Sequence, residues 1–239
     1  MLKNQVAVIT GASSGIGKAI ALELANQSVK LCLIGRHLNK LDEVASIARK
    51  TSPQVCTYQL DITQDEDIGY LKTYIEKDFG EVDILIHSAG IISFGEIQTT
   101  PVALLDEQYR TNVRAPYLLT QTLLPSLIKR QGQIVFINSI TIHTIKACFG
   151  QYTATKQALK AIADSLRAEV NSDGVRVISI YPGSTAGPMQ ASIRETEGRE
   201  YNPARLLQPE DVANTIIGAL QLPRTAEVTD INIRPFLKT

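Results

Sequence analysis

Tyr152 and Lys156, in the segment YTATK, have side chains that could exchange a proton with a bound molecule. Residues four apart are about one turn apart on a helix, so both side chains would lie on one face. A tyrosine phenol has an ordinary pKa of about 10, and a nearby ammonium group favours the phenolate and lowers that pKa. The spacing therefore predicts a tyrosine that trades protons near neutral pH. Aromatic and basic residues share this spacing on many helices, so the pair needs support from other residues.

Two polar residues could complete a site with this pair. Ser139 ends the apolar run IVFINS, thirteen residues before Tyr152. Ligands of α/β proteins bind at the carboxyl ends of strands, so this hydroxyl could donate to an oxygen of a bound molecule. Asn112 lies in TNVRAP within an expected long helix, where asparagine is a poor choice. Its presence would be explained if its amide held a water molecule behind Lys156.

A glycine-rich segment, TGASSGIG, connects the first expected strand to the helix that follows it. Phosphates bind at such turns on exposed backbone N–H groups and on the positive end of the helix dipole. Glycine is needed there because a Cβ atom would block close approach or oppose a positive φ. The segment predicts a dinucleotide site with contacts from Gly11, Ser13, Ser14, Gly15, Ile16 and Gly17.

The end of the second expected strand indicates which dinucleotide binds. An acidic residue at this place holds the adenine-ribose 2′-hydroxyl of NAD, whereas an arginine accommodates the 2′-phosphate of NADP. The strand ends Ile34-Gly35-Arg36 with no acidic residue, and a guanidinium can pair with phosphate bidentately. The sequence therefore favours NADP(H) over NAD(H). His37 and Lys40 could add positive potential or simply face water, and Arg36 itself could be a solvated loop charge.

The third and fourth expected strands end in residues that could touch the same cofactor. Asp61 could accept a hydrogen bond from the adenine amino group or cap the next helix, as Thr63 could. His87 is better explained as a core hydrogen-bonding residue than as a metal ligand, since no partner His or Cys lies at ligand spacing, and no metal is expected. Further cofactor contacts are expected from Ile62, Ser88, Ala89 and Gly90.

The composition limits the possible partners. The chain has 239 residues, of which 44% are hydrophobic and 20% charged, and its formal net charge is zero. No global field attracts it to nucleic acid or to anionic lipid, and no segment resembles a membrane span or a signal peptide. Cys32, Cys56 and Cys148 fit neither a disulfide framework nor a metal site. We therefore expect a cytoplasmic protein with a small-molecule substrate.

Short β-branched runs alternate with longer helical patterns along the whole chain, which predicts a doubly wound α/β fold with a parallel sheet between two helix layers. Expected strands are residues 6–10, 29–34, 55–60, 84–87, 134–138, 175–181 and 228–233. Expected helices are residues 15–27, 38–50, 64–78, 102–130, 151–172 and 209–220. No linker divides residues 1–239, so a single domain is expected. The irregular segment 184–207, with a short helix at 189–196, is either a lid or binding loop or a tolerated surface insertion.

Taken together, these motifs resemble those of the classical short-chain dehydrogenases/reductases over nearly the full length. The motifs TGASSGIG, HSAG, YTATK and the Pro182-Gly183 turn occur in order and at family-like spacing. The resemblance implies a Rossmann-type fold and a catalytic tetrad. In it, Tyr152 donates the proton, Ser139 orients the carbonyl, Lys156 tunes Tyr152 and holds the nicotinamide ribose, and Asn112 anchors a proton-relay water.

The chain departs from the family pattern at three places. HSAG stands where NNAG is common, and Ser14 stands where many NADP-preferring members carry a basic residue. In PGSTAG, Gly187 occupies the usual threonine position, so contact to the nicotinamide carboxamide is expected from Thr185. Pro182 and Gly183 are expected to touch the cofactor as well. The resemblance also implies a homodimer or homotetramer.

The expected activity is hydride transfer between NADP(H) and a small ketone, aldehyde or alcohol. The alternative is a dinucleotide-binding regulatory or scaffold protein on the same fold, which would have no need of the four tetrad residues together. Sequence context nominates as substrate-pocket walls Phe94, Ser139, His143, Phe149 and Met189.

Overall fold

Seven strands form one parallel sheet in the computed structural model, which describes residues 2–237. The strand order is β3-β2-β1-β4-β5-β6-β7, so the order reverses between β1 and β4. This confirms the predicted doubly wound α/β fold with a single sheet. The strands are β1 (Val6–Thr10), β2 (Lys30–Gly35), β3 (Val55–Gln59), β4 (Ile84–His87), β5 (Gln133–Ile137), β6 (Arg176–Pro182) and β7 (Asp230–Ile233).

The central strands are apolar because helices cover both of their faces. Every residue of β1, β4, β5 and β6 is buried, whereas β7 at the edge alternates between half-buried and exposed residues. Strands buried on both faces need no polar alternation, which is why the sequence reads as short continuous apolar runs. The predicted strands are all present, with ends displaced by a residue or two.

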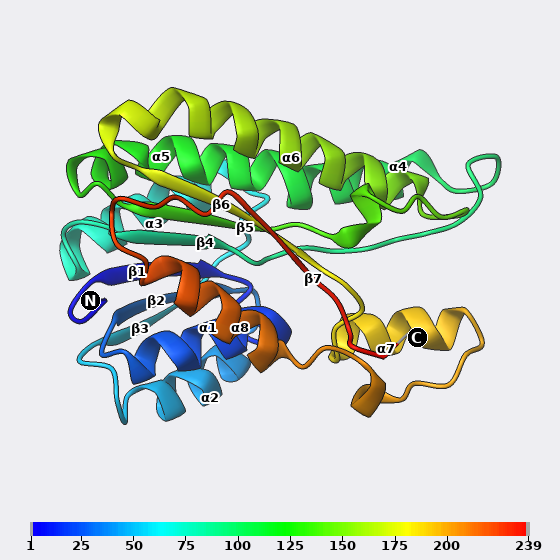
Figure 1. Ribbon diagram of the computed structural model, residues 1–239, viewed down its shortest axis with the longest axis horizontal. Helices are drawn as coiled ribbons and strands as arrows, with labels where there is room; N and C mark the ends of the chain where they lie inside the picture. The colour runs from blue at the N-terminus through cyan, green and yellow to red at the C-terminus, as the bar shows by residue number, and fades with distance from the viewer. Residues whose placement is uncertain (1, 238–239) are drawn as a thin grey trace.

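Helices form a layer on each face of the sheet, as Figure 1 shows. One apolar core joins the sheet to α1, α2 and α8, and a second core joins its other face to α3, α5 and α6. Helix α8 begins at the predicted proline, and its third residue, Asp211, accepts a hydrogen bond from the Gln208 backbone N–H at 2.9 Å. The helices are α1 (Gly15–Asn26), α2 (Leu38–Ala48), α3 (Asp65–Asp78), α4 (Val102–Tyr109), α5 (Ala115–Lys129), α6 (Gly150–Val170), α7 (Pro188–Thr196) and α8 (Pro209–Leu220).

The predicted helix 102–130 is not uniform. A π-helical segment, Arg110–Arg114, separates α4 from α5 and contains Asn112. Wider π turns occur mainly at functional sites, because they cost hydrogen-bond geometry that packing elsewhere must compensate. The residue that looked misplaced in a regular helix therefore lies in an irregular turn.

The segment 184–207 leaves the sheet and returns to the same point. Ser184 O accepts from the Leu207 N–H at 3.0 Å, and Ala186 N–H donates to Leu207 O at 2.7 Å. Between these contacts lie α7 and the short 3₁₀ turn Pro203–Arg205, which Figure 1 places beyond the ends of the strands. We refer to residues 184–207 as the flap.

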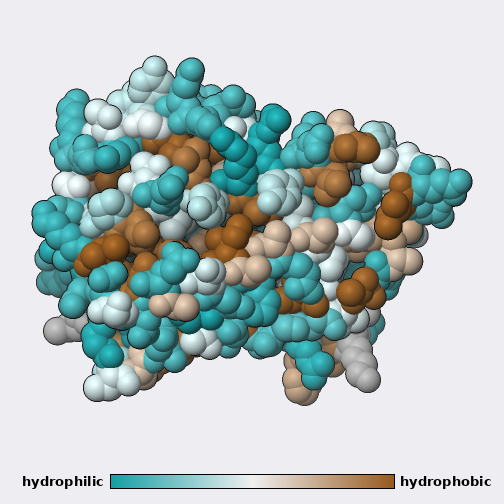
Figure 2. All heavy atoms as spheres, turned by 90° about the horizontal axis from the view of Figure 1, so that it is seen from above, coloured by the Kyte–Doolittle hydropathy of each residue, from teal (hydrophilic) through white to brown (hydrophobic). Residues whose placement is uncertain are grey.

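The outer surface of the α4–α6 layer is mixed in character. Figure 2, seen from above this layer, shows hydrophobic residues in separate patches between polar ones. Large side chains with considerable exposure on α4 and α5 include Val102, Tyr109 and Tyr117. Among the described residues, no helix is long and apolar enough to cross a membrane.

His87 at the end of β4 makes the stability of the fold depend on pH. Its ring is buried, stacks on Phe136 with centroids 4.7 Å apart, and bonds Thr120 Oγ1 through Nε2 at 2.8 Å. Burial lowers its pKa from 6.5 to about 3, because the charged form is poorly solvated there. Below pH 6.5 the unfolded chain therefore binds a proton that the folded chain does not, so acid destabilises the fold.

We expect His87→Asn to flatten the pH dependence of unfolding between pH 7.5 and pH 5. His87 stays neutral in the folded protein, so the free energy of unfolding of the wild type should fall by about 1.36 kcal/mol for each pH unit below pH 6.5. The total loss down to pH 5 should reach about 2 kcal/mol. Urea unfolding of both proteins at the two pH values measures the difference. Equal slopes for the two proteins would contradict the account.

Candidate active site

A cleft of about 550 Å³ opens at the carboxyl ends of the strands, where the strand order reverses. Ligands of doubly wound sheets bind at this place, because the diverging loops leave a crevice there. The structure brings together in its lining nearly all the predicted residues: Gly11, Ser13, Ser14, Gly15, Ile16, Gly17, Arg36, Asp61, Ile62, Ser88, Ala89, Gly90, Ser139, Phe149, Tyr152, Lys156, Pro182, Gly183, Thr185 and Met189.

The glycine turn after β1 is shaped by close backbone contacts. Gly11 has φ +67°, and a Cβ atom there would lie 2.8 Å from the Ala89 backbone. A Cβ atom on Gly17 would lie 2.3 Å from Gly11 O. Thr10 holds the facing loop, since its Oγ1 accepts from the N–H groups of Ser88 and Ala89 at 3.2 Å each. Glycine at positions 11 and 17 therefore lets the turn pack closely on itself and on the loop after β4, while a Cβ atom on Gly15 would meet nothing within 4 Å.

The far end of the cleft is basic. Arg36, His37 and Lys40 line it and are exposed. Within residues 2–237 no carboxylate forms a salt bridge with Arg36, so its guanidinium is available to an anion. Asp61 Oδ1 accepts from Thr63 N–H at 3.0 Å and Thr63 Oγ1 at 2.8 Å, which closes a turn before α3. The N-cap of α3 is Gln64, without a side-chain cap bond, so neither Asp61 nor Thr63 caps that helix as the sequence allowed.

Ser139 and Tyr152 meet in the middle of the cleft. Both are 8% exposed, and Ser139 lies within hydrogen-bonding reach of the Tyr152 phenol. Ser139 Oγ accepts from Thr141 N–H at 3.3 Å and Thr141 Oγ1 at 3.1 Å. Those contacts use its acceptor capacity and leave its own O–H to donate. The two hydroxyls can therefore address one oxygen atom of a ligand.

The predicted lowering of the Tyr152 pKa is wrong for the protein alone. Burial raises that pKa to about 12, and the hydrogen bond from Ser139 only partly opposes it. Lys156 is on the same helix face, but its Nζ lies 5.8 Å from the Tyr152 ring centroid and donates to Ile137 O at 2.9 Å. Burial also lowers the pKa of Lys156 to about 8. Desolvation of both groups thus outweighs their attraction.

Asn112 acts on the loop after β4 rather than lining the cleft. Its Oδ1 accepts from Ile91 N–H at 2.9 Å, and its Nδ2 donates to Ile91 O at 2.9 Å and to Thr155 Oγ1 at 3.1 Å. Both amide hydrogens are therefore used within the protein, and the water expected behind Lys156 stays a prediction. The side chain instead ties the π segment to the loop that ends at Gly90 and to α6.

Asn138 is a buried residue of the site that sequence reasoning treated only as the end of a strand. Its Nδ2 donates to Lys156 O at 3.1 Å, and its Oδ1 accepts from Ser139 N–H at 2.9 Å. It therefore joins the end of β5 to α6 and fixes Ser139 relative to Lys156. An amide directly before a strand-end serine was the available signal, since a buried asparagine needs partners at both of its polar atoms.

The substrate-pocket walls are only partly as expected. Phe149 and Met189 line the cleft, but Phe94 and His143 do not. Phe94 stacks behind Phe149 with centroids 5.3 Å apart, and the exposed His143 packs edge-on against Tyr181. The cleft has further lining residues that the sequence did not indicate. Lys146 comes from the loop before α6, and the others come from the flap, which no clear periodic pattern marked: Ile193, Arg194, Glu197 and Arg199.

Thr185 lies where the flap leaves the sheet. It pairs with Leu207 in an isolated parallel bridge, and its Oγ1 donates to Gly183 O at 3.0 Å. Gly183 in turn packs on the C-terminal tail, since a Cβ atom there would lie 3.0 Å from Pro235 Cδ. The turn that contains the predicted cofactor contacts is therefore held from two sides.

Comparison with known proteins agrees with this geometry. Residues 5–198 match the family described as short chain dehydrogenase. The chain belongs to the short-chain dehydrogenase family. It is similar to an uncharacterized oxidoreductase of Staphylococcus saprophyticus, with 34% identity over 98% of both chains, and to one of Staphylococcus aureus, with 32% identity over 98% of this chain and 99% of the relative.

Solved structures of short-chain dehydrogenases superpose closely. An alcohol dehydrogenase of Thermococcus sibiricus complexed with 5-hydroxy-NADP has a TM-score of 0.90 and 25% identity, covering 99% of each chain. A metagenomic short-chain oxidoreductase complexed with NADP has a TM-score of 0.85 and 28% identity, also over 99% of each chain. L-Sorbose reductase of Gluconobacter frateurii, with NADPH and L-sorbose, has a TM-score of 0.87 and 26% identity, covering 97% of this chain and 95% of its own.

We expect Asn138→Ala to lower the free energy of unfolding by about 1–3 kcal/mol, because the buried Ser139 N–H loses its acceptor. Urea unfolding followed by circular dichroism measures this. Asn202→Ala is a matched control, because Asn202 Oδ1 accepts from Ala204 N–H at 3.2 Å in an exposed turn. This substitution should lower the free energy of unfolding by well under about 1 kcal/mol. Equal losses in the two variants would contradict the assigned role of Asn138.

Proposed function

We propose that this short-chain dehydrogenase is an NADP(H)-dependent enzyme that interconverts a small ketone or aldehyde and its alcohol. The observation that carries the proposal is the convergence of Ser139, Tyr152 and Lys156 in one cleft with the glycine turn. A protein that only bound a dinucleotide would not need two hydroxyls and a buried amine together at that place.

The residues present fit a nicotinamide dinucleotide. Gly15 lines the cleft with open space where a Cβ atom would be, and Arg36 with Lys40 offers cations to a 2′-phosphate. NADP or NADPH in similar solved structures supports the same choice. Lys156 would hold the nicotinamide ribose, and Thr185 the carboxamide. When bound, the cofactor supplies or accepts the hydride.

The chain's own residues would handle the substrate oxygen and its proton. As hydride reaches the carbonyl carbon, negative charge develops on the oxygen, and the hydroxyls of Ser139 and Tyr152 stabilise it. The phenol of Tyr152, with its raised pKa, is fully protonated at neutral pH and is therefore ready to give its proton to that oxygen. In the reverse direction the phenolate must form, and positive charge nearby would favour it.

The rest of the arrangement serves this step. Asn112 would hold the loop at Ile91 so that Gly90 keeps the cofactor side of the cleft open, and the flap would close over the substrate. We further propose a cytoplasmic location and a homodimer or homotetramer that covers part of the apolar surface of α4 and α5 (Figure 2).

Replacing Tyr152 with phenylalanine should remove nearly all turnover while leaving cofactor binding intact. Loss of one donor to a developing oxyanion costs about 10²–10³ in rate, and the proton donor is lost as well. NADPH absorbance against a panel of aldehydes, ketones and β-keto esters measures turnover, and calorimetry measures NADPH binding. The exposed Tyr117→Phe is the control. Turnover in Tyr152→Phe within ten-fold of the wild type would refute the assignment, and NADPH binding by the wild type without turnover on any panel member would favour a regulatory role.

Replacing Arg36 with alanine should weaken NADPH binding about 10- to 100-fold and leave NADH binding unchanged, because only NADPH offers a phosphate to the guanidinium. Titration calorimetry with both nucleotides provides the measurement. The exposed Lys50→Ala, a cation outside the cleft, should alter neither affinity. Equal weakening toward both nucleotides would remove the basis for NADP selectivity.

A further inference from the structure

The cleft is basic although the chain is neutral. Of its lining residues, six are Lys or Arg and two are Asp or Glu, whereas the chain has 24 of each class. A concave surface with an excess of one charge concentrates ligands of the opposite charge. Arg36, Lys40 and Lys156 are accounted for by the proposed cofactor contacts. Three cations have no such role: Lys146, Arg194 and Arg199.

Arg194 is the most constrained of the three. It lies near the end of α7 and is 7% exposed, yet it lines the cleft. Its guanidinium has five N–H donors, and among residues 2–237 its nearest charged partner is Glu197 Oε2 at 4.0 Å, beyond hydrogen-bonding distance. None of its side-chain nitrogens is among the fully buried atoms that lack a hydrogen-bond partner, so they still reach the solvent in the cleft. They are therefore available to donate to an anion that enters it.

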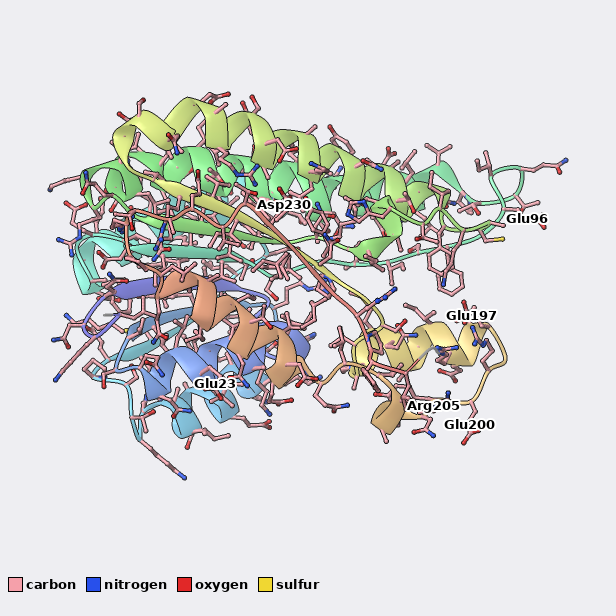
Figure 3. All side chains as sticks on the ribbon, viewed as in Figure 1. Glu23, Glu96, Glu197, Glu200, Arg205 and Asp230 are labelled. Atoms are coloured by element: carbon pink, nitrogen blue, oxygen red, sulfur yellow. The ribbon has the colours of Figure 1, made fainter. Side chains whose placement is uncertain are left out.

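Glu197 does not neutralise Arg194 fully, because its carboxylate also faces Arg199. Its Oε2 also lies 3.5 Å from Arg199 Nη1, so one carboxylate faces two guanidinium groups. Figure 3 shows Glu197 at the end of α7, on the side turned toward the loop that carries Glu96. Glu200 and Arg205 line a second hollow together with Arg194 and Arg199, and they add one charge of each sign, so they do not change the net charge of the group. The trio Arg194, Glu197 and Arg199 thus leaves one positive charge uncompensated beside the cleft.

The surroundings restrict the size and polarity of what binds. Ile193 and Met189 of α7 line the cleft beside Arg194, and Phe149 and Lys146 line it from the loop before α6. Tyr152 follows Phe149 within one helical turn, so the Phe149 wall adjoins the hydroxyls proposed to act on the carbonyl. A molecule that spans the two parts has a carbonyl at one end, a short apolar stretch and a group facing Arg194 at the other.

We propose that the substrate is a small oxo acid or the matching hydroxy acid, whose carboxylate is bound by Arg194 with Arg199 beside it. A carboxylate carries the single negative charge that the trio leaves uncompensated, and it accepts bidentate hydrogen bonds from guanidinium. In the reductive direction the carbonyl carbon gains a hydride from NADPH, its oxygen gains the proton of Tyr152, and hydroxy acid and NADP⁺ result. This inference rests on the proposed function and specifies its substrate class.

The test compares matched pairs of oxo acids and their methyl esters, which differ in charge but not in the carbonyl. The wild type should have the higher kcat/KM for the acids. Arg194→Gln should lower kcat/KM for the acids about 10- to 100-fold while changing the esters and the KM for NADPH little, and Arg194→Lys should recover part of the loss. Arg224→Gln, an exposed arginine outside the cleft, is the control.

Three results would overturn the inference: no preference of the wild type for acids, an equal loss for acid and ester in Arg194→Gln, or a rise confined to the KM for NADPH. Thermal unfolding of each variant identifies a folding defect, and Arg194→Lys then carries the comparison. If no carbonyl compound is reduced at all, the proposed function fails separately. Calorimetric titration of hydroxy acids into the protein with NADP⁺ then tests the carboxylate site alone, and absence of binding to the wild type would exclude it.

Discussion

The junction between the end of β5 and the first turns of α6 determines the geometry of the whole site. Asn138 bonds the Ser139 N–H and the Lys156 carbonyl, and Lys156 Nζ bonds Ile137 O, so strand and helix are joined by buried hydrogen bonds on both sides. Buried polar groups of this kind are costly unless every member is satisfied, and when satisfied they specify one arrangement. Ser139 and Tyr152 can address one oxygen atom because this junction leaves them little freedom.

Burial gives the site its electrostatic character. It raises the pKa of Tyr152 to about 12 and lowers that of Lys156 to about 8, so both groups favour their neutral forms more than in water. An environment that penalises charge also strengthens any interaction with charge that develops during a reaction. Arg194 is also held at low exposure and lines the cleft, so its interaction with an anion there would be stronger than in water.

The two ends of the cleft differ in how firmly they are built. The dinucleotide end consists of strand ends and backbone contacts that admit no side chain, as at Gly11 and Gly17. The end proposed for the substrate is formed largely by the flap, which is tied to the sheet at its base through Ser184, Ala186 and Leu207. A fixed cofactor end and a separate flap allow relatives of one fold to differ in substrate, because the flap can change without disturbing the sheet.

The sequence alone determined the order of elements, the parallel sheet and the residues at the glycine turn and strand ends that line the cleft, because apolar runs, a glycine turn and strand-end residues are local signals. Tertiary structure decided what depends on distant neighbours. Burial determines the sign of the Tyr152 pKa shift. Asn112 hydrogen-bonds the Ile91 backbone because folding brings that loop beside it. Phe94 stacks on Phe149 because of the way their two loops pack. Arg194 gave no signal in the chain, since a cation's role depends on whether folding buries it beside a partner or leaves it facing a cleft.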